Sequence, residues 1–198
     1  MTILDGLLER NRAWSQVQRA SDPEFFERLC GIQHPDFLWI GCADSRVPAN
    51  EITGTAPGEI FVHRNVANLV AAGDTNCMAV VQYAVEVLNV RHLIVCGHYG
   101  CGGVRAVLER ATAQIAHVDR WLTPLRHLAS RCAAELDALP DIDERANRLC
   151  ELNVIEQVER LGASDVVRAA RLRGADVRVY GLIYDLRDGL LRELKQPS

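Results

Sequence analysis

The sequence predicts an α/β fold, in which a single domain with a mostly parallel central β-sheet flanked by helices follows an N-terminal helical arm. Two observations lead to this prediction. Short apolar runs of strand length alternate along the chain with long stretches of helical periodicity, as in βαβ units. The chain has 198 residues, 48% of them hydrophobic, which suits one domain with a sizeable core. We place the arm at residues 1–30 and the α/β domain at residues 31–198.

Local signals predict the arm and the first two strands. Apolar residues recur at helical spacing from Leu4 to Trp14. A second helix is expected to begin at Asp22, with Asp22 as its N-cap and Pro23 at its first position. Two short apolar runs then predict buried strands at residues 37–41 and 59–62.

The remaining chain continues the same alternation. Apolar residues on one face predict a helix at residues 74–88, and a run of branched apolar residues predicts a strand at 92–97. A long helical region extends from Gly102 to about Arg173, with breaks at Thr123-Pro124 and Leu139-Pro140. A fourth strand is expected at residues 176–184 and an edge strand at 189–195.

Composition and charge argue against several classes of partner. The 22 basic and 26 acidic residues give a net charge of −4, so we expect no nucleic acid partner. No stretch has the length of a membrane span, and the first residues lack the pattern of a signal peptide, so we expect no membrane association. Seven cysteines without the spacing of a disulfide framework predict free thiols in a reducing, cytoplasmic compartment.

Three side chains form a candidate zinc site. Cys42 directly follows the first predicted strand, His98 directly follows the strand at 92–97, and Cys101 lies three residues further in a glycine-rich turn. Open α/β sheets bind ligands beyond the carboxyl ends of their strands, so two strand ends can bring these side chains together. Two thiolates and an imidazole suit Zn²⁺, and three protein ligands leave a fourth position open for chemistry. The rival interpretation, a phosphate-binding loop, lacks the required Lys-Ser/Thr pair and the dinucleotide-binding spacing.

An acid and a base follow the first of these residues. Asp44 and Arg46 lie two and four positions after Cys42. Arg46 can hold the Asp44 carboxylate through two parallel hydrogen bonds, which keeps it ionised and oriented as an acceptor. Asp44 can then accept a hydrogen bond from the group in the open zinc position. The alternative is that Asp44 becomes the fourth zinc ligand in a closed state and blocks the site.

The sequence resembles the β-class carbonic anhydrases, in particular their bicarbonate-regulated, type II-like subset. The resemblance covers nearly the whole chain and rests on four blocks in a fixed order. By this resemblance, Cys42, His98 and Cys101 bind one Zn²⁺ per chain, and Asp44 with Arg46 forms the catalytic dyad. The blocks are CADSRVP at 42–48, PGEIFVHRNVAN at 57–68, GHYGCGG at 97–103 and ELNV at 151–154.

The resemblance implies a lyase activity, the reversible hydration of CO₂ to bicarbonate and a proton by attack of a zinc-bound hydroxide. It also implies a substrate pocket formed by Gln33, Phe61, Tyr83 and the backbone of Gly102. We expect a homodimer, because the N-terminal helices of the family usually lie on the partner subunit. A tetramer is the alternative, and the end of the chain at Ser198 leaves the choice open, since relatives usually continue into another helical segment.

Three further positions match a second site of the regulated subset. Trp39, Arg64 and Tyr184 correspond to residues that bind bicarbonate away from the catalytic centre. The alternative roles are strand core for Trp39 and Tyr184 and a structural ion pair for Arg64. Our hypothesis is that bicarbonate bound there, like low pH, favours the closed state and so inhibits the enzyme.

Two other functions stay open. One is hydrolysis of CS₂ or COS at the same zinc site, and the other is a zinc-holding regulatory protein without turnover, which the Asp44–Arg46 pair disfavours. His63 is a candidate proton shuttle by position, with a structural role as the alternative. The remaining thiols, Cys30, Cys77, Cys96, Cys132 and Cys150, are interpreted as small buried hydrophobic residues, and His34, His92, His117 and His127 are assigned no role.

Overall fold

The chain divides into two compact units. The computed structural model describes residues 2–71, 73–112 and 115–195. Its contacts separate Met1–His34 from Pro35–Ser198. Within the described ranges, none of the helices is both long and apolar enough to span a bilayer.

The first unit consists of two helices. α1 (Ile3–Ser21) begins with a capping box, in which Asp5 N–H donates to Thr2 Oγ1 and Thr2 N–H donates to Asp5 Oδ2. α2 (Phe25–Leu29) begins two residues later than the sequence predicts and its N-cap residue is Glu24, so the assignment of Asp22 as its N-cap is wrong. Asp22 instead caps the end of α1 and its carboxylate accepts hydrogen bonds from Arg28 and from the backbone of Glu24. These bonds turn the chain at Pro23 before α2 can start.

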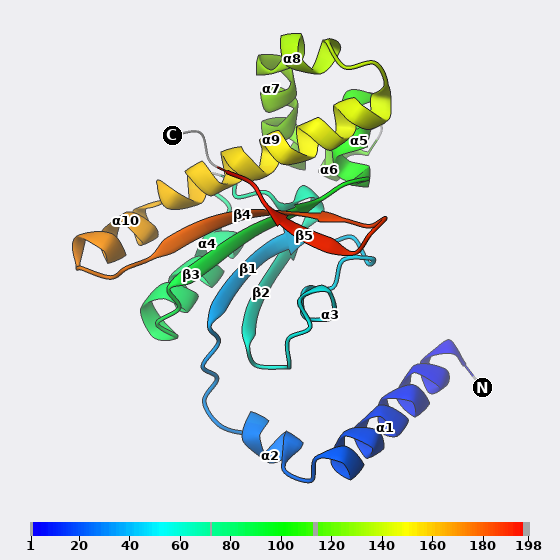
Figure 1. The fold of residues 1–198 in the computed structure, drawn as a ribbon, viewed down its shortest axis with the longest axis vertical. Helices are drawn as coiled ribbons and strands as arrows, with labels where there is room; N and C mark the ends of the chain where they lie inside the picture. Colours follow the sequence, from blue (N-terminus) through cyan, green and yellow to red (C-terminus); the bar gives the residue numbers. More distant parts are fainter. Residues whose placement is uncertain (1, 72, 113–114, 196–198) are drawn as a thin grey trace. The chain divides into compact units, whose positions relative to one another are not determined.

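The second unit is built on a five-stranded sheet (Figure 1). The strand order is β2-β1-β3-β4-β5, and all neighbours are parallel except the pair β4 and β5. The prediction of an α/β fold with a mostly parallel sheet is confirmed. The strands are β1 (Phe37–Cys42), β2 (Ile60–Asn65), β3 (His92–His98), β4 (Arg178–Asp185) and β5 (Leu190–Glu193).

The strand order creates a switch point between β1 and β3. β2 and β3 lie on opposite sides of β1, so the chain leaves the carboxyl ends of β1 and β3 in different directions. Ligands of open α/β sheets bind in the crevice that forms where the strand order reverses in this way. Cys42 and His98 are the last residues of these two strands.

The helices are shorter and more numerous than the sequence predicts. The helix predicted over residues 74–88 is α4 (Thr75–Gln82) followed by a π-helical turn, η2 (Tyr83–Val87). The predicted break at Thr123-Pro124 is confirmed, because Pro124 lies in the first turn of α7. The region after Gly102 contains α5 (Gly102–Leu108), α6 (Ala116–Trp121), α7 (Thr123–Arg131), α8 (Ala133–Asp137), α9 (Ile142–Gly162) and α10 (Asp165–Leu172). Two short elements, α3 (Ala49–Thr53) and η1 (Val66–Asn68), were not predicted.

Each face of the sheet has its own core. The larger core joins one face to α4, α5, α7, α9 and α10, and the smaller contains Trp39, Ala49, Ile94 and Cys96 on the other face. The approach of α9 to β3 requires a glycine at position 97, because a Cβ there would lie 2.6 Å from Val154 Cγ2. Two thiols depart from the prediction that all are buried: Cys30 is exposed and Cys132 is half-buried. Cys30 follows α2, which has no buried residue.

Candidate metal and catalytic site

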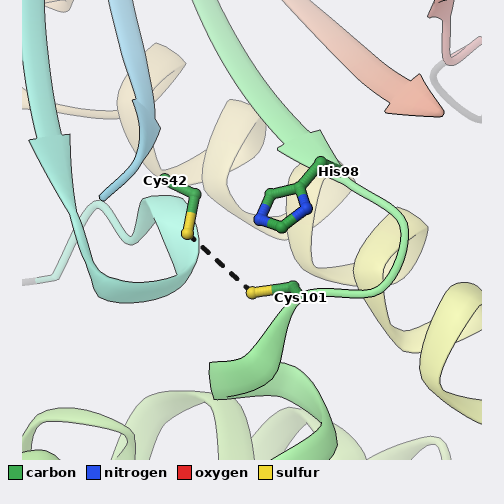
Figure 2. Close-up of side chains that lie close together, drawn as sticks. All are labelled: Cys42, His98 and Cys101. Atoms are coloured by element: carbon green, nitrogen blue, oxygen red, sulfur yellow. Dashed lines mark hydrogen bonds between the residues drawn. The ribbon is translucent and has the colours of Figure 1, made fainter. Parts of the chain in front are cut away.

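Cys42, His98 and Cys101 converge at the switch point of the sheet (Figure 2). Cys42 ends β1, His98 ends β3, and Cys101 is the N-cap residue of α5. Their potential ligand atoms all lie within 4.8 Å of one another, and the three residues are only 6%, 1% and 2% exposed. Gly100 allows the tight turn between His98 and Cys101, since its φ of 68° is in the left-handed region.

The geometry of these side chains fits Zn²⁺. The Sγ atoms of Cys42 and Cys101 are 3.9 Å apart, and two thiolates at Zn–S distances of about 2.3 Å in a tetrahedral site lie about 3.8 Å apart. His98 Nδ1 lies 2.9 Å from the carbonyl of Tyr99, so Nδ1–H donates there and the lone pair is on Nε2. Among the described residues, His98 Nε2 is one of two buried side-chain nitrogens without a hydrogen-bond partner, the other being Asn68 Nδ2. A buried imidazole nitrogen next to two thiols is a ligand set typical of zinc.

The surroundings favour ionisation of the first thiol. A hydrogen bond from Cys101 lowers the pKa of Cys42, and hydrogen bonds from the backbone N–H groups of Asp44 and Ala67 add to this effect. The hydrogen bond to Cys42 and burial raise the pKa of Cys101 in turn. The pair thus shares one proton readily, and a metal is needed to hold both sulfurs as thiolates.

Asp44 and Arg46 form the predicted ion pair at the edge of this cluster. Arg46 Nε donates to Asp44 Oδ1 at 2.9 Å and Arg46 Nη2 donates to Asp44 Oδ2 at 2.7 Å. These bonds hold the pKa of Asp44 well below its ordinary value, so the carboxylate stays ionised. Asp44 Oδ2 also lies 3.8 Å from His98 Nε2, which places an acceptor oxygen beside the position where a metal would bind.

The turn that carries His98 and Cys101 is also anchored through Tyr99, Arg148 and Glu151, to which the sequence assigns no role. Tyr99 N–H donates to the carbonyl of Tyr184, and the Tyr99 hydroxyl donates to Glu151 on α9. Arg148 donates to the other oxygen of Glu151, and Arg46 Nη2 donates to the carbonyl of Gly100. Glu151 lies in the ELNV block, so its place in a family motif was the available signal.

The residues expected to form the substrate pocket differ in what the structure shows of their contacts. The rings of Phe61 and Tyr83 stack at 5.8 Å, and Tyr83 is half exposed. Gly102 opens α5 directly after Cys101. Gln33 belongs to the N-terminal unit. Within the α/β unit, the structure shows a contact between Phe61 and Tyr83.

Trp39, Arg64 and Tyr184 share one face of the sheet. Trp39 is buried in the smaller core, and Tyr184 packs against that core. A Cβ at position 41 would lie 2.3 Å from Trp39 Nε1, so the indole covers Gly41, the register partner of Arg64. Arg64 donates to the carbonyls of Cys42 and Asp44 rather than to a carboxylate, so the alternative of a structural ion pair is not what the structure shows.

A second buried group also combines a histidine, a carboxylate and a thiol. Potential ligand atoms of His63, Asp74 and Cys77 lie within 4.8 Å of one another. Asp74 Oδ1, however, caps α4 by accepting the backbone N–H groups of Asn76 and Cys77. His63 Nε2 lies 3.3 Å from Asn65 Nδ2, and burial raises the pKa of Cys77 to about 12. The group thus holds an un-ionised thiol and a carboxylate that already caps a helix, which is typical of a structural cluster.

Comparisons with known proteins agree with this geometry. The carbonic anhydrase family profile matches residues 37–191. The chain is 46% identical over 190 residues to a carbonic anhydrase of Emericella nidulans, a match that covers 96% of this chain and 82% of that protein. One of two tetrameric β-carbonic anhydrases from Sordaria macrospora has 40% identity and a TM-score of 0.92, over 96% of each chain. A β-carbonic anhydrase of Aspergillus fumigatus has 41% identity and a TM-score of 0.93, over 100% of this chain and 93% of that one.

Proposed function

Because the chain belongs to the β-carbonic anhydrase family and is a carbonic anhydrase, we propose that its zinc is held by Cys42, His98 and Cys101 and that Asp44 and Arg46 complete the catalytic site. One observation carries this proposal: the unpartnered Nε2 of His98 lies between two thiols and an arginine-held carboxylate. When bound, zinc supplies Lewis acidity that lowers the pKa of water from 15.7 to about 7.

We propose that the Asp44–Arg46 pair orients the water species that attacks CO₂. An ionised carboxylate only accepts hydrogen bonds, so Asp44 Oδ2 can accept one from the attacking water species and direct its lone pair at CO₂. The guanidinium and the backbone N–H of Arg46 both donate to the Asp44 carboxylate, which leaves it little freedom to rotate. The bond from Arg46 to the Gly100 carbonyl ties this pair to the turn that carries His98.

The stacked rings of Phe61 and Tyr83 offer an apolar surface for the substrate. CO₂ carries no net charge and is bound by apolar contact more than by hydrogen bonds. We propose that these rings form one wall of its pocket. Gln33 and the backbone of Gly102 stay candidates by family resemblance alone.

Stopped-flow CO₂ hydration on protein of known zinc content tests the catalytic proposal. We expect activity that rises with pH, and loss of most of it in Asp44→Ala with zinc retained. Zinc-replete protein that is inactive from neutral to alkaline pH would reject the function. Parallel assays with CS₂ and COS show whether the same site prefers those substrates.

Inhibition by bicarbonate at Trp39, Arg64 and Tyr184 is the second part of the proposal. Its support is the pair of bonds from Arg64 to the carbonyls of Cys42 and Asp44. An anion that draws the guanidinium toward itself weakens these bonds and frees the segment that carries Asp44. Asp44 is then able to leave Arg46 and bind the metal as the fourth ligand of the closed state.

Single variants test this site by removing one donor each. Trp39→Phe removes the indole N–H and Tyr184→Phe removes the hydroxyl, and we expect each to weaken bicarbonate inhibition. Tyr180→Phe is a matched control on the same face of β4, where the Tyr180 hydroxyl meets His92 Nδ1 at 3.0 Å. Unchanged inhibition in both test variants would reject the bicarbonate site.

We also propose a homo-oligomer, with a dimer as the smallest assembly and a tetramer as the alternative. Its support is the exposed apolar surface of α1, which buries no residue within the chain. Sedimentation velocity, with Leu8→Glu compared to Glu9→Gln, measures whether this surface holds subunits together. The apolar residues concerned are Ile3, Leu4, Leu7, Leu8, Trp14 and Val17.

A further inference from the structure

The segment at residues 65–70 lies between the two cysteines of the proposed zinc site. Asn65 pairs with Cys42 at the end of β2, and its carbonyl accepts the N–H of Ala43 at 2.8 Å. On the other side the segment packs against the start of α5. A Cβ at Gly103, two residues after Cys101, would lie 3.1 Å from Val66 Cγ1. A shift of this segment therefore acts directly on the surroundings of both sulfurs.

Two residues of the segment adopt an unfavourable backbone conformation. Ala67 has φ = 65° and Asn68 has φ = 46°, although neither is glycine. Both are buried, at 0% and 2% exposure. Such a conformation persists only where surrounding contacts impose it.

A chain of amide hydrogen bonds from α9 imposes it. Asn153 Nδ2 donates to the Ala67 carbonyl at 2.9 Å, and Gln157 Nε2 donates to Asn153 Oδ1 at 3.0 Å. Gln157 Oε1 accepts the N–H of Val70 at 2.9 Å. Because Gln157 Oε1 faces a backbone N–H, its amide can point only one way, and this sets the orientation of Asn153 too. Both side chains are fully buried, and they lie one helical turn apart.

This turn adjoins the backbone of both cysteines of the metal site. A Cβ at Gly103 would also lie 3.4 Å from the Ala67 Cβ, so Ala67 itself packs against the first turn of α5, which starts directly after Cys101. Contacts outside the ligand set orient the ligands of a metal, so a firmly held turn keeps them in place. We propose that Asn153, oriented by Gln157, is a positioning residue for the metal centre: it holds the Ala67–Asn68 turn between the end of β1, which carries Cys42, and the start of α5, which carries Cys101. This proposal rests on the assignment of Cys42 as a zinc ligand.

Cobalt substitution tests the proposal through a spectroscopic signature. The thiolate-to-cobalt charge-transfer band reports how the two sulfurs bond to the metal, so a displacement of either cysteine shifts it. We expect this shift in Asn153→Leu, which keeps the size of the side chain and removes its donor. We also expect zinc release to a chelator to accelerate by about 10- to 100-fold, the usual effect of losing a partner of a metal ligand.

Further variants separate positioning from general loosening. Gln157→Met removes only the outer link and should shift the band less, in the same direction, so it serves as the test if Asn153→Leu does not fold. Trp121→Phe removes the bond of 2.8 Å from Trp121 Nε1 to the neighbouring Val66 carbonyl and should leave the band in place. Ala67→Gly added to Asn153→Leu should restore the band, because glycine adopts positive φ without strain.

The outcomes distinguish this inference from the proposed function. A folded Asn153→Leu or Gln157→Met variant with an unshifted band would overturn the inference, as would an equal shift in Trp121→Phe. If the unmodified protein binds cobalt without any thiolate charge-transfer band, the ligand assignment itself fails.

Discussion

Two buried clusters in the α/β unit combine a histidine with a thiol, and they differ in what their polar atoms face. At the switch point of the sheet, His98 Nε2 has no partner and hydrogen bonds lower the pKa of Cys42. In the second cluster, Asp74 is occupied by two backbone N–H groups and burial raises the pKa of Cys77 to about 12. Similar residue types therefore favour a thiolate in one place and an un-ionised thiol in the other.

The difference teaches that the neighbours of a cluster decide its chemistry. Cys42 ends a central strand, and the hydrogen bond from Cys101 lowers the pKa of its thiol. Cys77 lies in the first turn of α4, but Asp74 already caps that helix and adds a negative charge that disfavours a thiolate. We therefore propose that the first cluster is a metal site and that the second is a packed element of the core.

The largest difference should appear when the cysteines are replaced. Cys42→Ser exchanges a soft thiolate for a hydroxyl. We expect the zinc affinity to fall by more than the about 10- to 100-fold that follows when a metal ligand loses a hydrogen-bond partner. CO₂ hydration should fall to the uncatalysed level. Metal analysis after gel filtration, together with stopped-flow rates, measures both effects.

Cys77→Ser is the matched control. It should keep one zinc per chain and full activity, and lose about 1–3 kcal/mol of unfolding free energy because a hydroxyl is buried without a designed partner. Zinc loss in Cys77→Ser comparable to that in Cys42→Ser would erase the distinction between the clusters.

The second-largest difference should appear when the carboxylates of the two clusters, Asp44 and Asp74, are replaced. Asp44→Asn removes the negative charge that orients the attacking group, and we expect the CO₂ hydration rate to fall by about 10²- to 10⁴-fold with zinc retained. Asp74→Asn should leave the rate unchanged, because asparagine caps helices as well as aspartate does. Stopped-flow assays of both variants at equal zinc content make the comparison. A fully active Asp44→Asn enzyme would remove Asp44 from the catalytic site.

The smallest expected effect concerns the pH dependence of stability. Burial lowers the pKa of His63 in the folded protein, with a smaller opposing effect of Asp74. Below about pH 6.5 the unfolded chain therefore binds a proton at His63 that the folded chain does not bind. The free energy of unfolding falls as the pH drops from 6.5 toward the pKa of His63 in the folded protein. His63→Gln should flatten this part of the curve, as measured by urea unfolding between pH 7 and 5. An unaltered slope would mean that His63 titrates alike in both states.

Much of the site follows from local sequence. Cys42 and His98 each follow an apolar run of strand length, so the periodicity that predicts the strands also predicts that these residues meet at one sheet edge. The bidentate pair of Asp44 and Arg46 is two residues apart in the chain and forms as predicted.

The features that the sequence does not reveal depend on distant contacts. The left-handed turn at Ala67 and Asn68 contains no glycine, so the local sequence does not predict it. Asn153 and Gln157, from another part of the chain, hold it in place. A pair of polar residues four positions apart on the buried face of a helix was the only local sign of that network. The start of α2 was wrongly predicted because Asp22 binds Arg28 instead of capping the helix.

Zinc titration of metal-free protein tests the central claim most directly. With Cys42, His98 and Cys101 as the single zinc site, CO₂ hydration should rise in proportion to added zinc and stop rising at one equivalent per chain. Activity that needs a second equivalent, or that never appears although one equivalent is bound, would contradict this account.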